Sequence, residues 1–497
     1  MKNKIIKLIL SLIAAFFITS CSDYLDVNTQ PGQKDEDELA MKDLLAPVLK
    51  NTVTSNYYAA SVVSNYTQYF GGYGYAAQGQ SSCASTWSVM YTDVFPNLKL
   101  IKEKAAESGA THYKAVADII TAINLSTAVE LWGDVVYSEA TQPETYQYPS
   151  LDDGETVYSQ ALQLLDDAIS ALQGSDSSGI IMEDEDMIYG GDLDKWLRAA
   201  YTYKARLQLK LMKNGGTSAS DVLTSINNGF TSNDDDFQLS YVGAPSNNPY
   251  YTINVTQRST SNYYNALNDQ LISLMNGNQY PFTSITEDPR LSAMFVKEIG
   301  VGVSAPATDP WRGFMNGGDG ESSDGESGNT FYKDGGFHTS SDSPLILITY
   351  AEAMFIKAEA EFLNAGGTTT STGINSAGYS AYLAGIQANM DKLSVSGSSY
   401  LADASVDVGE ANLQLHNIMR EKYIANIHNT ETYNDFRRYD FSSDVFKGLD
   451  IRIQQPDDEY LGQWYRRAYY PETGETNSNP NIISDESTSV TDIWLFQ

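Results

Sequence analysis

Aromatic and amide side chains are the residues in this sequence whose types and spacing suit a binding site. The chain of 497 residues holds 34 tyrosines but only 17 phenylalanines. Exposed rings can stack on the apolar face of a sugar while nearby amides bond its hydroxyl groups, and they suit extended peptides nearly as well. We therefore predict ligand binding at Tyr73, Tyr75, Trp87, Trp311 and Asn316. Trp311 and the Tyr73/Tyr75 pair lie beside glycines and are expected to be exposed, whereas the alternative role for any such ring is packing against helices.

Motifs for catalysis are absent or lack their structural context. The sequence contains no Gly-Lys dipeptide, no H-E-x-x-H and no G-x-S-x-G. Relaxed dinucleotide patterns at Gly72 and Gly300 do not stand between a strand and a helix. A carboxylate pair for glycoside hydrolysis cannot be picked out from 63 acidic residues. We expect no enzyme activity, and we expect each of four scattered histidines to be a surface or hydrogen-bonding residue: His112, His338, His416 and His428.

Metal binding has one candidate segment, Asp319-Gly-Glu-Ser-Ser-Asp324-Gly-Glu326. Clustered oxygens suit calcium, but the segment lacks the spacing of an EF-hand loop, so a solvated turn is favoured. We expect no cofactor, with a structural calcium ion as the alternative.

The amino-terminal segment is typical of an exported lipoprotein. Lys2, Lys4 and Lys7 precede an apolar run over 5–18, which is too short for a membrane-spanning helix. Phe17-Ile18-Thr19-Ser20-Cys21 resembles a bacterial lipobox, which predicts cleavage after residue 20 and lipid attachment at Cys21. Acyl chains would then hold the protein at a membrane without spanning it. Ordinary secretion is the alternative.

Composition predicts a folded, strongly acidic protein. The formal net charge is −32, which makes nucleic acid and anionic lipid surfaces unlikely partners by repulsion. Apolar residues make up 42% of the chain, enough for a substantial core. With Cys21 acylated, Cys83 is the remaining thiol, and we expect it to be buried and unreactive.

Apolar residues recur at helical spacing in four segments, 116–132, 157–172, 196–211 and 347–362, with Asp152 placed to cap the second. Further helices are expected at 36–56, 57–70, 86–107, 377–392, 409–427 and 430–440. Paired helices a few tens of residues apart are typical of a solenoid. The prediction is a mostly α fold, a helical-hairpin, tetratricopeptide-like right-handed solenoid, with a large loop-rich insertion carrying short strands. The 34-residue tetratricopeptide consensus itself is absent.

The chain divides into a signal peptide (1–20), a lipidated tether (21–35) and a single domain (36–497). Within that domain we predict helical repeats over 36–227, a loop-rich insertion forming a ligand surface over 228–343, further repeats over 344–443 and a loop-rich tail over 444–497. A hundred irregular residues between helices are more typical of a functional insertion than of a linker.

Several segments together resemble the SusD/RagB family of outer-membrane nutrient-binding lipoproteins. Ser22–Asp26 is similar to the family's start, and Glu130–Tyr137 resembles its "FGDVP" turn with Val136 in the place of proline. The other matching segments are Lys195–Leu207 ("A-x-A-L-x-A-R"), Leu345–Ala360 with "Y-A-E-A" at Tyr350–Ala353, Arg420–Tyr423 and Tyr433–Arg438. Tyr433 replaces tryptophan and Asn429-Thr430-Glu431 replaces Gly-x-R, which resembles a divergent SusD-like branch.

The resemblance implies four helical-hairpin repeats and a ligand surface formed by the insertion and loops. It also implies a partner, a SusC-like TonB-dependent transporter over which the lipoprotein sits as a lid. The expected function is capture of oligosaccharides at the outer face of the outer membrane, without chemistry. Oligopeptide cargo is the alternative, and an exported glycoside hydrolase or a surface adhesin is favoured less. The matching motifs are scaffold motifs, so no binding residue is carried over from them.

Overall fold

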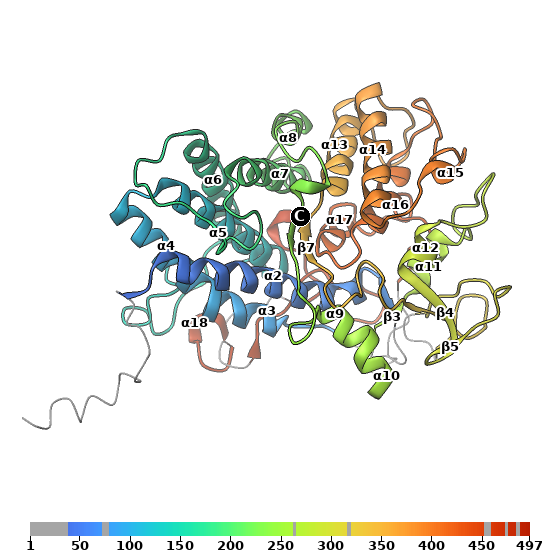
Figure 1. Cartoon of the computed structure of the whole chain (residues 1–497), viewed down its shortest axis with the longest axis horizontal. Helices are drawn as coiled ribbons and strands as arrows, with labels where there is room; N and C mark the ends of the chain where they lie inside the picture. Colours follow the sequence, from blue (N-terminus) through green and yellow to red (C-terminus); the bar gives the residue numbers. More distant parts are fainter. Residues whose placement is uncertain are drawn as a thin grey trace, which may run out of the picture.

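Consecutive helical hairpins form the scaffold of the molecule (Figure 1). The computed structural model describes residues 38–71, 79–261, 265–315, 320–451, 459–472, 476–483 and 488–497. The scaffold helices are α2 (Met41–Tyr66), α3 (Ala84–Val89), α4 (Phe95–Ser108), α5 (Thr111–Trp132), α6 (Gly154–Gln173), α7 (Leu193–Leu211), α8 (Ala219–Ile226), α13 (Tyr350–Asn364), α14 (Ser376–Lys392), α15 (Ser398–Leu401), α16 (Leu415–Ala425) and α17 (Glu431–Arg438). Neighbours in sequence pack together, as α5 with α6, α7 with α8, and α13 with α14. The predicted helical-hairpin fold is confirmed.

The second predicted helix shows how local sequence sets an element. Its apolar positions, from Val157 to Leu172, are buried in α6, as their spacing predicts. The N-cap is Asp153, whose Oδ1 accepts from the Thr156 N–H at 2.9 Å. The prediction of Asp152 as the cap is therefore wrong by one residue. Asp152 instead accepts from the backbone N–H groups of Tyr137 and Ser138, both at 2.8 Å, and fastens the preceding loop.

Two boundaries predicted from the sequence are wrong. The segments 36–56 and 57–70 form one helix, α2, which continues past Pro47 because its buried positions form an unbroken stripe. The start of the 347–362 stripe is not helical, since Leu345–Ile348 forms strand β7. These residues pair antiparallel with β2 (Phe237–Leu239), and a short buried apolar run does not distinguish a strand from a helix.

Helix α5 (Thr111–Trp132) is buried over nearly its whole length. By length and hydropathy it is the one described helix that could cross a membrane, but its most apolar window is completely buried within the protein. Burial on all sides explains an apolar composition without a polar face. The helix therefore belongs to the core, between α4 and α6.

Between residues 228 and 343 the elements are short. They are a 3₁₀ turn at Asn233–Asp235, β2, α9 (Pro249–Tyr251), a π-helical segment at Thr252–Gln257, α10 (Arg258–Ser261), β3 (Ala266–Leu267), α11 (Asp269–Met275), α12 (Arg290–Met294), β4 (Phe295–Gly300), β5 (Val303–Ser304) and β6 (Thr330–Tyr332). Strand β4 lies in the insertion, where short strands are predicted, and is central in the sheet β5-β4-β6. A second small sheet joins β3 to β1 (Phe70–Gly71). The remaining elements are a π-helical segment at Met90–Val94, α18 (Pro480–Ile483) and a 3₁₀ turn at Trp494–Phe496.

A buried network of charges ties five scaffold helices together. Arg206 of α7 binds Glu352 of α13 through two hydrogen bonds, of 2.7 and 2.5 Å. Lys210 follows one turn later in α7, and its Nζ lies 2.7 Å from Glu130 Oε1 of α5 and 2.8 Å from Glu431 Oε2 of α17. All five side chains are at most 7% exposed. The network continues to α16 through Lys422, Glu359, Asp435 and Arg438.

The motifs that carry the family resemblance meet in this network. Glu130, Arg206 and Glu352 come from three of the segments quoted above, which are far apart in the sequence. Arg290 of α12 forms a second buried cluster, with Asp288 at 2.6 Å and Glu421 of α16 at 2.7 Å. The first cluster holds the helices in register, and the second anchors the 228–343 segment to them.

Candidate functional site

A polar hollow opens where the end of α2, helix α11 and the chain after α17 meet. It has a volume of about 390 Å³, within the range of small-molecule sites. The lining residues, called here the amide hollow, are Gln68, Asn268, Asp269, Gln270, Ser273, Gln279, Met315, Ser323, Gly448, Asp450 and Ile451. Segments separated by almost four hundred residues thus contribute to one surface.

The β1–β3 pair fixes one wall of the amide hollow. Asn268 follows β3 and donates its backbone N–H to the Tyr69 carbonyl at 2.9 Å. Phe314 runs along the other edge of β3, donating to the Leu267 carbonyl at 2.7 Å. This packing requires glycine at two positions, because a Cβ on Gly71 would lie 2.3 Å from the Phe314 oxygen and one on Gly313 would lie 2.4 Å from the Asp269 Cα.

The opposite wall is chain 447–451, held by two glutamine side chains. Gln68 Nε2 donates to the Asp450 carbonyl at 2.7 Å, and Gln270 Nε2 donates to the Lys447 carbonyl at 3.0 Å. Gly448 has a positive φ of 75°, and a Cβ there would lie 2.2 Å from Gln279 Nε2. The backbone and the Gln279 amide are therefore in direct contact.

Eight of the eleven described lining residues of the hollow carry an amide, carboxylate or hydroxyl group. Asp269 accepts from the Ser322 hydroxyl at 2.8 Å and from the Ser273 hydroxyl at 3.2 Å. Asn268 caps α11 with its Oδ1, but its buried Nδ2 has no hydrogen-bond partner among the described residues. Paired donors and acceptors of this kind suit a neutral ligand with many hydroxyl groups. None of the described lining residues is aromatic.

The expected exposure of Trp311 is wrong. Trp311 is 7% exposed, its indole N–H donates to Glu287 at 2.9 Å, and Lys297 Nζ lies 5.3 Å from its ring centre. Trp87 is 4% exposed and packs against Trp132 with ring centres 5.0 Å apart. Neither ring presents a face to a ligand, so both belong to the core.

Glycine was the misleading signal for the exposure of Trp311. Gly313, two residues after Trp311, lets the chain lie against Asn268 and Asp269 and does not mark an exposed turn. Gly71 of β1 likewise lets the chain lie close to the Phe314 carbonyl. Three of the predicted ligand residues, Tyr73, Tyr75 and Asn316, lie outside the described residues, as does Cys21. They stay predictions, although Asn316 directly follows Met315 of the hollow in the sequence.

Amide-bearing lining residues were missed because single glutamines and asparagines carry no sequence pattern. Gln68 ends the predicted 57–70 helix, and Gln270 and Gln279 stand at no recognisable motif. The Asn-Asp pair at 268–269, just before an apolar run, is a helix-start signal and not a ligand signal. Sequence reasoning could place residues 268–279 in the insertion and Gln68 near a helix end, but it could not place either of them beside the tail.

Metal and thiol chemistry have no visible site in the described part of the chain. No group of three or more histidine, cysteine, aspartate or glutamate side chains there could hold a metal ion. The predicted calcium loop lies partly outside the described residues and stays a prediction; its Asp324 accepts from Arg312 Nε at 2.6 Å. Cys83 is a free, buried cysteine, which confirms the predicted burial, and burial raises the pKa of its thiol to about 12, which disfavours the reactive thiolate.

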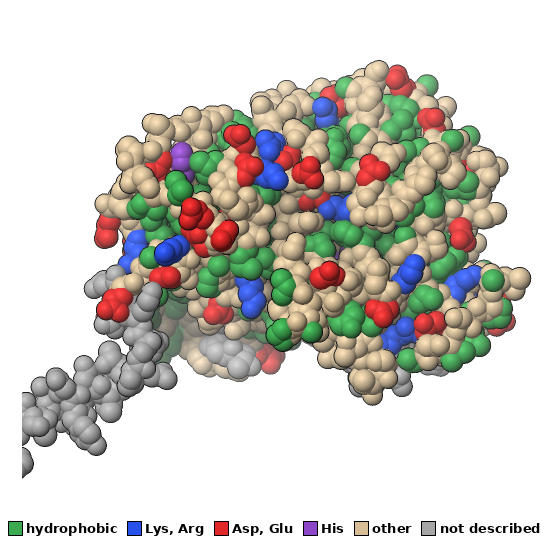
Figure 2. Space-filling model, viewed as in Figure 1, with side chains coloured by type: hydrophobic (Ala, Val, Ile, Leu, Met, Phe, Trp, Pro, Cys, Tyr) green, Lys and Arg blue, Asp and Glu red, His purple; other side chains and the backbone are tan. Residues whose placement is uncertain are grey.

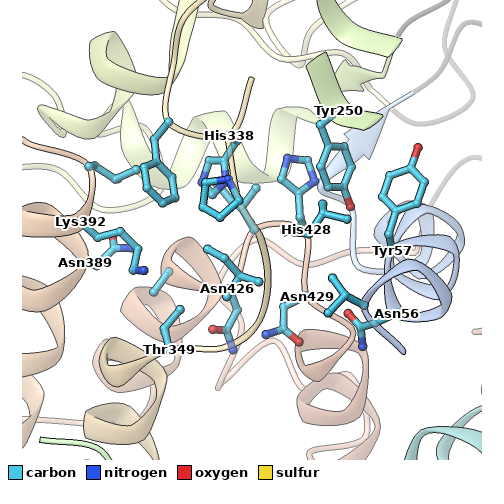
Figure 3. Close-up of a pocket in the computed structure, with 18 residues that line it drawn as sticks. Asn56, Tyr57, Tyr250, His338, Thr349, Asn389, Lys392, Asn426, His428 and Asn429 are labelled. Carbon is cyan, nitrogen blue, oxygen red and sulfur yellow. The ribbon is translucent and has the colours of Figure 1, made fainter. Parts of the chain in front are cut away.

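Two histidines distant in sequence meet at a small interior cavity (Figure 3). The ring of His428 stacks on Tyr250 with ring centres 3.7 Å apart, and the ring centre of His338 lies 5.2 Å from that of His428. Both ring nitrogens of His428 lack hydrogen-bond partners among the described residues, so its prediction as a surface or hydrogen-bonding histidine is wrong. The cavity, about 30 Å³, has room for about one water molecule and none for a sugar ring.

Burial keeps both of these imidazoles neutral. It lowers the pKa of His428 well below the ordinary value, with a smaller contribution from His338. Burial and the nearby Lys392 charge lower the pKa of His338 to about 4. The cavity joins α2, α14, the 228–343 segment and the loop after α16, so protonation would place positive charge at that junction (Figure 3).

Acidification from pH 6.5 to 4 is therefore expected to lower the free energy of unfolding. The unfolded histidines titrate near pH 6.5, so in this window the unfolded state binds more protons than the folded state. The free energy of unfolding therefore decreases as the pH decreases. Each histidine contributes up to about 1.4 kcal/mol per pH unit to this decrease in the free energy of unfolding. Urea unfolding at pH 7, 6, 5 and 4.5 measures this slope. The same slope in His428→Gln as in the parent chain would contradict the assignment.

The surface around these sites is acidic but mixed. Figure 2 shows acidic side chains spread over one face with lysines and arginines between them, so the net charge of −32 is not gathered into one patch there.

Comparisons with known proteins agree with the fold. The family model described as "Starch-binding associating with outer membrane" matches residues 33–471. A SusD/RagB family protein from Bacteroides thetaiotaomicron is 22% identical with a TM-score of 0.70, covering 92% of this chain and 99% of its own. A chitin-binding protein is 20% identical with a TM-score of 0.72, covering 92% and 100%. A chitin-binding SusD homolog from Flavobacterium johnsoniae is 19% identical with a TM-score of 0.69, covering 92% and 98%.

No curated protein sequence matches the chain. The family model nevertheless spans the scaffold, the amide hollow and about half of the tail, and the structural similarity extends over more than nine tenths of the chain. The chain therefore belongs to the SusD-like family of outer-membrane-associated, carbohydrate-binding proteins.

Proposed function

We propose that this protein is a cell-surface lipoprotein that captures oligosaccharides in the amide hollow and delivers them to a TonB-dependent transporter of the outer membrane. The observation that carries the proposal is the lining of the hollow. Amide and carboxylate groups from three distant segments converge there without an ion cluster, as recognition of a neutral, hydroxyl-rich ligand requires.

Cys21 would carry the lipid anchor, so that the folded body stays at the outer face of the membrane. Delivery to a SusC-like barrel is supported by family membership, because the family associates with the outer membrane. The protein would bind its ligand and release it unchanged. Starch and chitin are the glycans in the descriptions of the family and of similar structures, and they define the first ligands to test.

Calorimetric titration of the soluble chain from Ser22 tests the proposed function. We expect a malto- or chito-oligosaccharide to bind in the micromolar to millimolar range and to be recovered intact, because hydrogen bonding and one shallow hollow give modest affinity. Tryptic oligopeptides serve as the comparison ligands. Binding of peptides alone would assign peptide cargo instead, and recovery of a cleaved oligosaccharide would contradict the absence of chemistry.

A further inference from the structure

A second pocket lies at the other end of the molecule, between α4, α5 and the loop 137–142. Its volume is about 500 Å³, and Figure 1 places α4 and α5 far along the long axis from α11 of the amide hollow. The pocket, called here the lysine pocket, contains two lysines of α4, Lys99 and Lys102. The chain has twice as many acidic as basic residues, so two lysines in one pocket suggest a specific role for them.

The lysines around the lysine pocket share their carboxylate partners. Asp118 is 2% exposed and shared by two lysines, with Lys114 Nζ 2.5 Å from its Oδ2 and Lys102 Nζ 3.7 Å from its Oδ1. Asp118 Oδ1 has no hydrogen-bond partner among the described residues. The Nζ atom of Lys99 lies 4.0 Å from Glu103 Oε1. Lys102 therefore shares Asp118 with Lys114, and no carboxylate oxygen lies closer to its Nζ than 3.7 Å among the described residues.

Lys102 is the cation with the poorest partners. Beyond the 3.7 Å contact to Asp118, its Nζ makes one hydrogen bond, of 3.3 Å, to the Thr121 hydroxyl. Burial lowers the pKa of Lys102, as expected for an ammonium group whose desolvation is not fully compensated. An anionic oxygen in the pocket would supply the missing partner.

The remaining lining combines an apolar wall with hydroxyl and amide groups. Phe95, Leu98 and Ala140 are apolar, and Thr141 and Gln142 are polar. The Tyr137 side chain also lines the pocket, and its hydroxyl bonds no other described residue. A pyranose ring has the matching properties, an apolar C–H face and a rim of hydroxyl groups.

We propose that the lysine pocket binds a uronic acid, the carboxylate-bearing form of a pyranose, with its carboxylate on Lys102 Nζ and its ring beside Tyr137. The single poorly partnered ammonium group of Lys102 matches a singly charged carboxylate better than a doubly charged phosphate. The apolar wall and the hydroxyl groups favour a sugar ring over an acid that lacks hydroxyl groups. The site is separate from the amide hollow and does not depend on its proposed function.

Titration with D-glucuronic acid and with D-glucose at pH 7 and low salt tests this proposal, because the two sugars differ at the carboxylate. We expect glucuronic acid to bind at least tenfold more tightly than glucose. Lys102→Met, which keeps the apolar stem, should weaken glucuronic acid binding at least tenfold. Lys104→Met, on the same helix but outside the pocket, should leave it within twofold.

Tyr137→Phe provides a variant that keeps the fold, since it deletes a hydroxyl that bonds no other described residue, and it should weaken binding severalfold. Equal affinity for glucose and glucuronic acid, or unchanged affinity in Lys102→Met, would overturn the proposal. Tighter binding of benzoate than of glucuronic acid would overturn the assignment to a sugar. Asp269→Ala in the amide hollow should not change glucuronic acid binding, so the two sites are tested independently.

Discussion

Replacing Arg206 by methionine is expected to lower the free energy of unfolding by about 3–5 kcal/mol. The guanidinium group makes two hydrogen bonds to Glu352 and one, of 2.8 Å, to the Leu347 carbonyl. Methionine fills much of the same volume but leaves the Glu352 carboxylate, which is fully buried, without its cation. An unpaired buried charge costs more than the ion pair contributes, because water cannot reach it. Urea unfolding of the soluble chain at pH 7 measures the loss.

Lys204→Met is the matched control on the same helix. Lys204 pairs with Asp166 at the surface, where the two side chains are 21% and 47% exposed, so its loss should cost at most about 1 kcal/mol. The double variant Arg206→Met/Glu352→Met should recover part of the lost stability, because it removes both buried charges. A single Arg206→Met variant as stable as Lys204→Met would show that the network does not hold the scaffold.

Replacing Asp269 by alanine is expected to weaken oligosaccharide binding about 10- to 100-fold. A carboxylate that accepts a hydrogen bond from a ligand hydroxyl contributes about 1.5–3 kcal/mol, and 1.4 kcal/mol corresponds to a tenfold change in affinity. Asp269 begins α11 at the centre of the amide hollow, and its present partners are serine hydroxyls, the same chemistry that a sugar offers. Calorimetric titration with the oligosaccharide that binds the parent chain measures the change.

Asp334→Ala is the control for charge, since Asp334 is an exposed acid of the insertion outside the hollow. It should bind the oligosaccharide as the parent does. Gln279→Ala removes an exposed amide from the hollow without loss of charge and should weaken binding about 2- to 10-fold. Affinity within twofold of the parent in both Asp269→Ala and Gln279→Ala would place the ligand elsewhere.

The helices that carry the scaffold were predictable because their signal is local. In α6 and α7 the apolar side chains recur every three or four residues, and that spacing alone places them on one face. The boundary at Leu345–Ile348 was not predictable, since four apolar residues suit a strand or a helix equally. Pairing with Phe237–Leu239, about a hundred residues away, selects the strand.

Side-chain exposure was the property that sequence reasoning judged least well. A tryptophan beside a glycine can lie on a surface loop or against a tightly packed backbone, and Trp311 is in the second situation. His338 and His428 gave no sign of proximity, although their rings lie 5.2 Å apart. Each of these outcomes depends on which distant segment covers the residue, and no local pattern encodes that.

The sequence by itself determined the helical-hairpin scaffold and the family to which the chain belongs, because periodicity and motif order are properties of short segments. The tertiary structure alone decided which residues line each pocket. Gln68, Asn268 and Asp450 share one hollow only after α2, the insertion and the tail have packed together. The same is true of Lys102 and Tyr137 in the lysine pocket. Binding surfaces arise from long-range contacts, whereas helices arise from neighbours three and four residues apart.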